Sequence, residues 1–150
     1  MLESGAGTVF GLGDYALMTL KTIVLEDEPL IAEAIAQMLR GLGHQVCGVA
    51  HSAGELPALL SAHKPELVTI DVNLGDRHDG IGVATLLESA GCLPIVFITG
   101  GVDEEERQDI LAVEGSTLLL KPFTVDQLAM AIQAAVQRAR EDCSPELGPS

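Results

Sequence analysis

The sequence predicts an α/β domain in which a parallel sheet is covered by helices on both faces. Five apolar runs of four to six residues, rich in valine, isoleucine and leucine, alternate with segments whose apolar residues recur at helical spacing. A chain of 150 residues, 47% of them hydrophobic, can build one domain around a proper core. Alternation of this kind is typical of a doubly wound, five-stranded parallel sheet with helical crossovers.

Each apolar run is bounded by residues that break regular structure, and we expect each run to form one buried strand. The first run reads TIVL and precedes Glu26, and the last reads STLLL and precedes Lys121. The expected strands cover residues 22–26, 45–50, 67–71, 94–99 and 117–120.

A helix is expected after each strand. In the first, apolar residues between Leu30 and Leu42 recur at helical spacing, and Pro29 suits an early helical position. The second has Ser52 as a candidate cap, and Pro57 near its first turn displaces or kinks its start. The second to fifth helices are expected at about 53–63, at about 80–90, from about 102 onward and at about 124–141.

The fourth of these helices has the thinnest apolar face. Its acidic start, residues 103–106, complements the positive end of the helix dipole. Its apolar stripe consists of Ile110, Leu111 and Val113. We therefore expect it to be the least firmly packed helix.

The two ends of the chain lack these patterns. Residues 1–20 are glycine-rich and are expected to form a flexible extension, and residues 142–150 are expected to fray as a disordered tail. One domain is therefore expected at 21–141. Residues 11–16 fit the dinucleotide pattern G-x-G-x-x-A, but a strand rather than a helix follows them, so we reject that motif.

Composition excludes several classes of function. Against 22 acidic residues there are 8 basic ones, and a surface with a net charge of −14 repels phosphate backbones, so direct nucleic-acid binding is not expected. No apolar stretch has the length of a membrane span and no signal-peptide pattern is present, so we expect no membrane association and a cytoplasmic location. Cys47, Cys92 and Cys143 have no metal-site spacing and are expected to be reduced structural thiols, with a redox switch as the minor alternative.

Polar side chains follow four of the apolar runs at the point where each strand ends. Glu26 and Asp27 follow the first, Asp71 the third, Thr99 the fourth and Lys121 the fifth. In an open α/β sheet, ligands bind outside the carboxyl ends of the strands. The pattern therefore gathers three acids, a hydroxyl and an ammonium group along one edge of the sheet, and it predicts a site there.

The three acids favour a metal site. If the first and third strands are neighbours, Glu26, Asp27 and Asp71 lie close together, and carboxylates so placed resist joint ionisation. A hard divalent cation removes this conflict, and oxygen ligands with open water positions suit Mg²⁺. Asn73 can add its backbone carbonyl. The competing interpretation, solvated acids at the starts of loops, does not account for the hydroxyl and ammonium groups on the same edge.

The same edge indicates phosphoryl chemistry. Lys121 and Thr99 beside a metal can hold the oxygens of a transferred phosphoryl group. An aspartate can accept that group as an acyl phosphate. Asp71 is the best candidate nucleophile, because the VNLGD loop that follows it can bend around a metal bound beside it.

Taken together, these segments resemble the receiver domains of two-component response regulators. Each matching piece is short, but their order and separations over about residues 21–140 are highly specific. The pieces are VLEDE at 24–28, DVNLGD at 71–76, DG at 79–80, FITG at 97–100 and KPF at 121–123.

The resemblance implies a flavodoxin-like strand order, 2-1-3-4-5. It implies that Asp71 accepts a phosphoryl group from a histidine kinase or a histidine phosphotransfer protein. Thr99 and Lys121 would contact that group, and the Lys121–Pro122 peptide bond would be cis. Mg²⁺ would bind Asp27, Asp71 and the carbonyl of Asn73.

Three features depart from the family's commonest pattern or mark a subgroup. Glu26, which would reach the metal through water, stands where the family often has aspartate. Leu118 stands where many members have a tyrosine or phenylalanine, so the usual aromatic switch coupled to Thr99 is not expected. Residues 94–101 resemble a subgroup with the pattern P-x-x-F-x-T-G, whose members often lack that aromatic and have a mobile fourth helix.

The resulting hypothesis is a stand-alone phosphoacceptor, a monomer or weak homodimer, with no catalysis beyond its own phosphoryl transfer and dephosphorylation. It would signal to a downstream protein target through its fourth helix, fifth strand and fifth helix. One alternative is an aspartate-dependent phosphohydrolase of the haloacid dehalogenase type, which needs an aspartate where Asn73 stands. Another is a degenerate receiver that acts as a binding module, which the full set of phosphorylation residues argues against.

The histidines do not suggest a phosphotransfer site. None of them is expected in the middle of a helix on an exposed polar face, where a phosphorylated histidine would lie. His78 is expected nearest the site, as a solvated side chain. The others are His44, His51 and His63.

Overall fold

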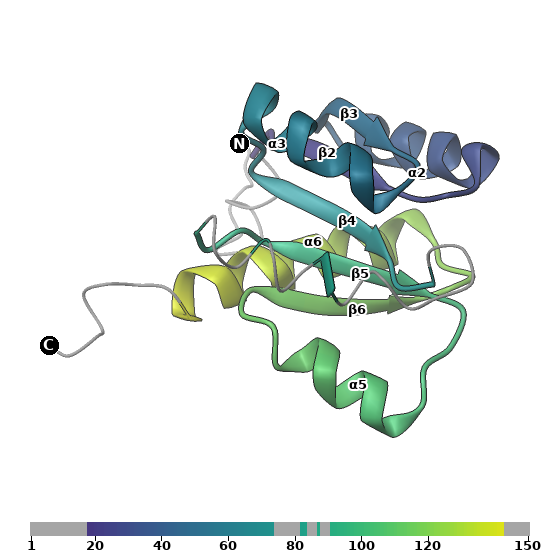
Figure 1. Ribbon diagram of the computed structural model, residues 1–150, viewed down its shortest axis with the longest axis vertical. Coiled ribbons are helices and arrows are strands. Elements are labelled where there is room, and N and C mark those ends of the chain that lie inside the picture. Colours follow the sequence, from purple (N-terminus) through teal and green to yellow (C-terminus); the bar gives the residue numbers. More distant parts are fainter. Residues whose placement is uncertain (1–17, 74–81, 84–86, 88–90, 143–150) are drawn as a thin grey trace, which may run out of the picture.

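The computed structural model describes residues 18–73, 82–83, 87 and 91–142 (Figure 1). These residues contain a five-stranded parallel sheet in the order β3-β2-β4-β5-β6. Counted along the chain, the order is 2-1-3-4-5, so the predicted fold class and strand order are confirmed. The strands are β2 (Lys21–Leu25), β3 (Gln45–Ala50), β4 (Leu67–Asp71), β5 (Ile95–Thr99) and β6 (Ser116–Leu120).

The strand bounds differ from the expected ones by at most one residue at either end. Agreement is this close because the central strands are buried on both faces, and a strand with no solvent-facing side reads as an unbroken apolar run. Every residue of β4 and of β5 is buried.

Helices lie against the sheet in the positions expected from sequence. The structure describes only residues 82, 83 and 87 of the helix expected at 80–90, and all three are helical. The other helices are α2 (Pro29–Gly41), the 3-10 turn η1 (Ala53–Glu55), α3 (Leu56–His63), α5 (Glu104–Leu111) and α6 (Val125–Asp142).

Pro57 displaces the start of the second helix, as predicted. Residues 53–55 form the 3-10 turn η1, and α3 begins only at Leu56, with the proline in its first turn. Ser52 precedes η1 but makes no capping hydrogen bond. Its hydroxyl instead donates to Oε2 of Glu55 at 3.2 Å.

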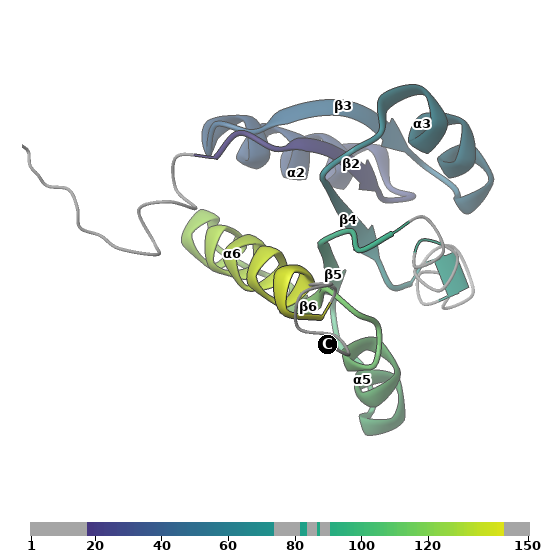
Figure 2. The same cartoon turned by 90° about the vertical axis from the view of Figure 1, so that its left-hand side faces the viewer.

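The helices form two layers, one on each face of the sheet (Figure 2). Helices α2 and α6 cover one face through a core that includes Leu39, Leu128 and Ile132. Helices α3 and α5 cover the other through a core that includes Leu56, Phe97 and Ile110. The predicted doubly wound arrangement is therefore present.

Helix α5 is short and buries little. Asp103 and Glu106 close a reciprocal capping box at its start, and Ile110 is its buried residue. The thin apolar stripe expected from sequence is therefore confirmed. Leu118 lies partly buried against the core on this face.

Most of both predicted termini, residues 1–17 and 143–150, lies outside the described residues. Leu20, by contrast, is buried in the core, and α6 extends to Asp142. The Asp142 carboxylate accepts a hydrogen bond from the Gly115 N–H at 2.8 Å. None of the helices in the described ranges has the length and hydropathy needed to cross a membrane.

The cysteine prediction is correct for one described residue and wrong for the other. Cys47 is a free thiol, and its Sγ lies 3.5 Å from the carbonyl oxygen of Thr22. Cys92 is disulfide-bonded. Spacing along the chain does not reveal which thiols the fold brings together. Cys143 lies outside the described residues.

Two buried threonines on neighbouring strands differ in how their hydroxyls are satisfied. The Thr22 hydroxyl donates to the Leu20 carbonyl at 3.1 Å. The Thr69 hydroxyl has no hydrogen-bond partner in the described part of the chain. Both residues are essentially inaccessible to solvent. A buried polar group without a partner costs free energy that an apolar group of the same shape does not.

Thr69→Val is therefore expected to raise the free energy of unfolding by about 1 kcal/mol, because it removes an unsatisfied hydroxyl without changing shape. Thr22→Val, the matched control, is expected to lower it by about 1 kcal/mol, because a made hydrogen bond is lost. Denaturant unfolding measures both values. Equal destabilisation by the two substitutions would contradict this account of Thr69.

Candidate functional site

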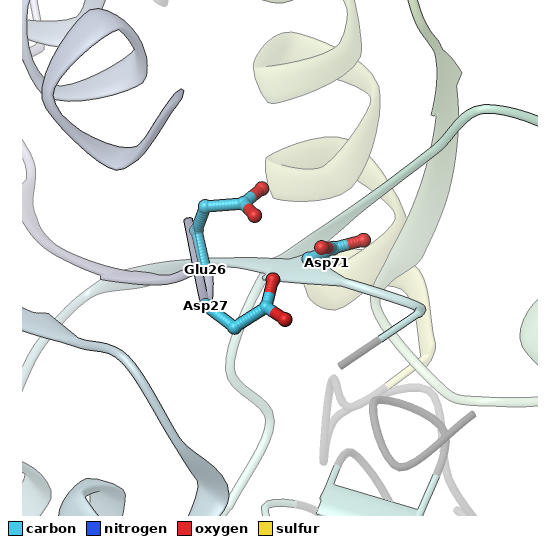
Figure 3. Close-up of side chains that lie close together, drawn as sticks. All are labelled: Glu26, Asp27 and Asp71. Atoms are coloured by element: carbon cyan, nitrogen blue, oxygen red, sulfur yellow. The ribbon is translucent and has the colours of Figure 1, made fainter. Parts of the chain in front are cut away.

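The structure gathers the three predicted acids at the carboxyl end of the sheet (Figure 3). Glu26 and Asp27 follow β2, and Asp71 is the last residue of β4, the strand that pairs with β2. One carboxylate oxygen from each of the three lies within 4.8 Å of the others. We call these three residues the acidic cluster.

Two members of the acidic cluster are buried. Glu26 is 1% exposed and Asp71 is 5% exposed, whereas Asp27 is partly exposed. Backbone N–H groups orient both buried carboxylates. Glu28 donates to Oε2 of Glu26 at 3.2 Å, and Asn73 donates to Oδ1 of Asp71 at 3.0 Å.

Lys121 brings one positive charge to the acidic cluster. Its Nζ lies 3.5 Å from Oε1 of Glu26 and 4.0 Å from Oδ1 of Asp71. Its backbone N–H donates to the Thr99 carbonyl at 2.8 Å, which fixes the turn that follows β6 against β5. The Lys121–Pro122 peptide bond is cis, as the resemblance implied.

One ammonium group does not offset the cost of burying these acids. Burial raises the pKa of Glu26 from its ordinary 4.5 to about 7, and the negative charge of Asp71 adds to the rise. The Glu28 N–H and Lys121 act in the opposite direction, but they do not cancel it. The site is therefore short of positive charge near neutral pH.

The donor set fits a hard divalent cation. The acidic cluster offers carboxylate oxygens alone, and its three carboxylates with one ammonium group leave a formal charge of −2 when all are ionised. Oxygen ligands at a partly open site are typical of Mg²⁺. Partly exposed Asp27 lies on the side from which water can complete the coordination.

Thr99 and Asn73 connect the end of β5 to the acidic cluster. The buried Thr99 hydroxyl donates to the Gly101 carbonyl at 3.1 Å, and it lies 3.2 Å from the Gly101 N–H. The side-chain amide of Asn73 donates to the same hydroxyl at 3.4 Å. Asn73 therefore contacts both Asp71 and Thr99, and its carbonyl as a metal ligand remains a prediction.

Sequence reasoning missed one contact of the site. Nδ1 of His51 lies 3.1 Å from the backbone carbonyl oxygen of Glu26. The available signal was position, because His51 directly follows β3, which pairs with β2. His78, which was expected nearest the site, lies outside the described residues.

Comparison with known proteins decides the family. Residues 22–133 match the response regulator receiver domain. The chain belongs to this family. It is thus a receiver domain of two-component signalling, and its relatives act as regulators rather than as conventional enzymes.

Two curated relatives contain a matching segment within a longer chain. The transcriptional regulatory protein PdtaR of Mycobacterium tuberculosis is 35% identical over 126 residues, which cover 84% of this chain and 61% of PdtaR. The phyllosphere-induced regulator PhyR of Methylorubrum extorquens is 32% identical over 123 residues, which cover 79% of this chain and 44% of PhyR. The receiver domain thus spans less than two thirds of either relative.

Solved structures agree with this assignment. The anti-anti-sigma factor PhyR of Bartonella quintana superposes with a TM-score of 0.71 at 32% identity, covering 86% of this chain and 52% of that one. The receiver domain of Erythrobacter litoralis PhyR superposes with a TM-score of 0.67 at 29% identity, covering 81% of this chain and 93% of that one.

The raised pKa of Glu26 predicts a pH-dependent stability in metal-free buffer. Below pH 4.5 this carboxyl is protonated in both states. Between pH 4.5 and about 7 it ionises in the unfolded chain but not in the folded one, so the free energy of unfolding falls as the pH rises. Above that pH range, the free energy of unfolding is lower by roughly 3 kcal/mol.

Glu26→Gln is neutral at every pH and removes this dependence. Relative to wild type, its free energy of unfolding in the presence of a chelator should rise by roughly 3 kcal/mol from pH 4.5 to pH 8. Glu105→Gln, on the exposed first turn of α5, is the control and should show no such rise. A difference between Glu26→Gln and wild type that stays constant with pH would contradict the raised pKa.

Proposed function

We propose that this receiver domain is a phosphoacceptor that takes a phosphoryl group onto Asp71 from a histidine kinase or a histidine phosphotransfer protein. The observation that carries this proposal is the acidic cluster with the Lys121 ammonium group within 3.5 Å of Glu26 and 4.0 Å of Asp71. An ammonium group beside a nucleophilic carboxylate can hold the oxygens of an incoming phosphoryl group.

Asp71 is the member of the acidic cluster best suited to attack phosphorus. Its Oδ1 accepts the Asn73 N–H and faces Lys121, so the carboxylate is held in a defined orientation. Burial favours the protonated form of Glu26 up to about pH 7, which makes Glu26 the poorer nucleophile. In the transfer, a bond forms between an Asp71 oxygen and phosphorus, the phosphorus–nitrogen bond breaks, and its electron pair returns to the departing imidazole.

Glu26, Asp27, Asp71 and the Asn73 carbonyl would hold Mg²⁺. When bound, Mg²⁺ supplies the positive charge that lets neighbouring anionic groups approach one another. Asp27 is the most accessible of the three acids and offers its oxygen from the solvent side. Glu26 is fixed through the Glu28 N–H and contributes charge from the buried side.

Thr99 and Lys121 are the proposed contacts of the phosphoryl oxygens. The Lys121 ammonium group needs little movement for this role, since it already lies beside Asp71. The Thr99 hydroxyl now bonds with Gly101 and would have to turn from that loop toward the phosphoryl group. Thr99 thereby couples phosphorylation to the segment that leads into α5.

Output is proposed to pass through protein contacts in the cytoplasm. Leu120 of β6 and Val125 and Met130 of α6 are exposed apolar residues on the elements expected to carry the signal. The solved relative from Bartonella quintana is titled an anti-anti-sigma factor. A net charge of −14 favours partners with basic surfaces and opposes direct nucleic-acid binding.

The phosphohydrolase alternative lacks a residue that it needs. Such an enzyme places a second aspartate two residues after its nucleophile, and Asn73 occupies that position. The side chain of Asn73 is a hydrogen-bond donor to Thr99, a contact that a carboxylate cannot make. A receiver domain that signals without phosphorylation is the remaining alternative, and the following experiment separates it from the proposal.

Beryllofluoride with Mg²⁺ imitates a phosphorylated aspartate, and it is expected to bind the wild-type chain and shift the NMR signals of α5. Asp71→Asn should weaken this binding by about 100-fold, the equivalent of roughly 3 kcal/mol. Asp126→Asn removes the same charge from the exposed first turn of α6 and should bind as wild type does. Equal affinity of wild type and Asp71→Asn would overturn Asp71 as the phosphoacceptor.

A further inference from the structure

His51 and Ala50 hold the backbone of Glu26 from both sides. The Glu26 N–H donates to the Ala50 carbonyl at 2.9 Å, which continues the pairing of β2 with β3. The Glu26 carbonyl oxygen lies 3.1 Å from Nδ1 of His51. Both polar groups of the Glu26 backbone are thus held by consecutive residues of the neighbouring chain segment.

The contact defines which ring nitrogen of His51 carries a proton. A backbone carbonyl has no hydrogen to give, so Nδ1 must be the donor in this hydrogen bond. A neutral His51 is then in the Nδ1–H form, and the orientation of its ring is fixed by the same bond. This leaves Nε2 without the proton that it carries in the other neutral form.

His51 is itself braced by the turn that follows it. Its backbone N–H donates to Oε1 of Glu55 at 3.3 Å, and the Ser52 hydroxyl donates to Oε2 of the same carboxylate at 3.2 Å. One side chain of η1 therefore ties residues 51 and 52 together. With the backbone of His51 held in this way, the ring bonds to the Glu26 carbonyl at little further entropic cost.

The held carbonyl belongs to the peptide that joins Glu26 to Asp27. Because a peptide unit is planar, fixing its carbonyl fixes the plane from which the Asp27 Cα and side chain extend. Asp27 is the partly exposed member of the acidic cluster, and its side chain extends from the residue that this peptide leads into. The orientation of this peptide therefore controls where the Asp27 carboxylate lies.

We propose that His51 is a positioning residue for the acidic cluster, which holds the Glu26–Asp27 peptide through its Nδ1–H and so sets the affinity for a divalent cation. The proposal for His51 rests on the proposed function, because it assumes that the acidic cluster binds Mg²⁺. Groups that orient metal ligands commonly change metal affinity by about 10-fold or more when they are removed.

The test measures binding of Mg²⁺ alone by calorimetry to the full chain. His51→Ala is expected to bind about 10-fold more weakly than wild type. His51→Asn is expected to stay within about twofold, because an asparagine amide can place an N–H donor where Nδ1 lies. His63→Ala, at the far end of α3, is the control and should bind as wild type does.

The outcomes separate this inference from the proposed function. If wild type binds Mg²⁺ and His51→Ala binds equally well, the inference is overturned and the metal site stands. If His51→Ala and His51→Asn are weakened equally, the donor role of Nδ1 is wrong. If wild type does not bind Mg²⁺, the proposed metal site and the positioning role both fail.

The ring nitrogens of His51 give a second measurement that needs neither a metal nor a destabilising variant. In the metal-free wild-type chain, ¹⁵N NMR should show a proton on Nδ1 and, in the neutral ring, none on Nε2. A neutral ring protonated on Nε2 would overturn the proposal, since that form has no proton to donate to the Glu26 carbonyl.

Discussion

The burial of two carboxylates side by side, those of Glu26 and Asp71, is the constraint on which the rest of the site depends. Pairing of β2 with β4 forces these two acids together, and burial raises the pKa of Glu26 to about 7. The fold tolerates this conflict because the surrounding strands are buried on both faces and supply hydrophobic stabilisation. Among the described residues, Lys121 relieves this conflict, and Asn73 and His51 hold the backbone or carboxylate of the acids in place.

Two polar side chains reach these acids from the two edge strands of the sheet. Lys121 reaches both buried acids from the end of β6, and His51 holds the Glu26 carbonyl from the end of β3. Lys121 therefore offsets the negative charge of the acids, and His51 orients the Glu26 backbone. Asn73 adds a third connection, since its backbone and side chain join Asp71 to Thr99. Asn73 thus links Asp71 to Thr99, which precedes the segment that leads to α5.

The sequence predicted the elements and the acidic cluster because both follow from local patterns. Buried strands read as apolar runs, and the residues that follow them must meet at one edge of a parallel sheet. Contacts between side chains depend on tertiary packing, so local sequence patterns could not predict them. No local pattern predicted the contact of His51 with Glu26, and Cys92 was predicted to be a free thiol, because nothing in the spacing shows what the fold brings beside these two residues. The effect of Pro57 was predicted only in part. Its ring predicted a displaced helix start, but not the 3-10 turn that precedes the helix.

The most direct test of the account is to locate the acyl phosphate. The chain is incubated with Mg²⁺ and phosphoramidate, a small donor with a phosphorus–nitrogen bond. Borohydride then reduces an aspartyl phosphate to homoserine, which peptide mass spectrometry identifies. The account predicts homoserine at position 71, dependent on Mg²⁺ and missing when the chelator is present. Modification at Asp27 or Glu26 in place of Asp71, or none with Mg²⁺ bound, would contradict it.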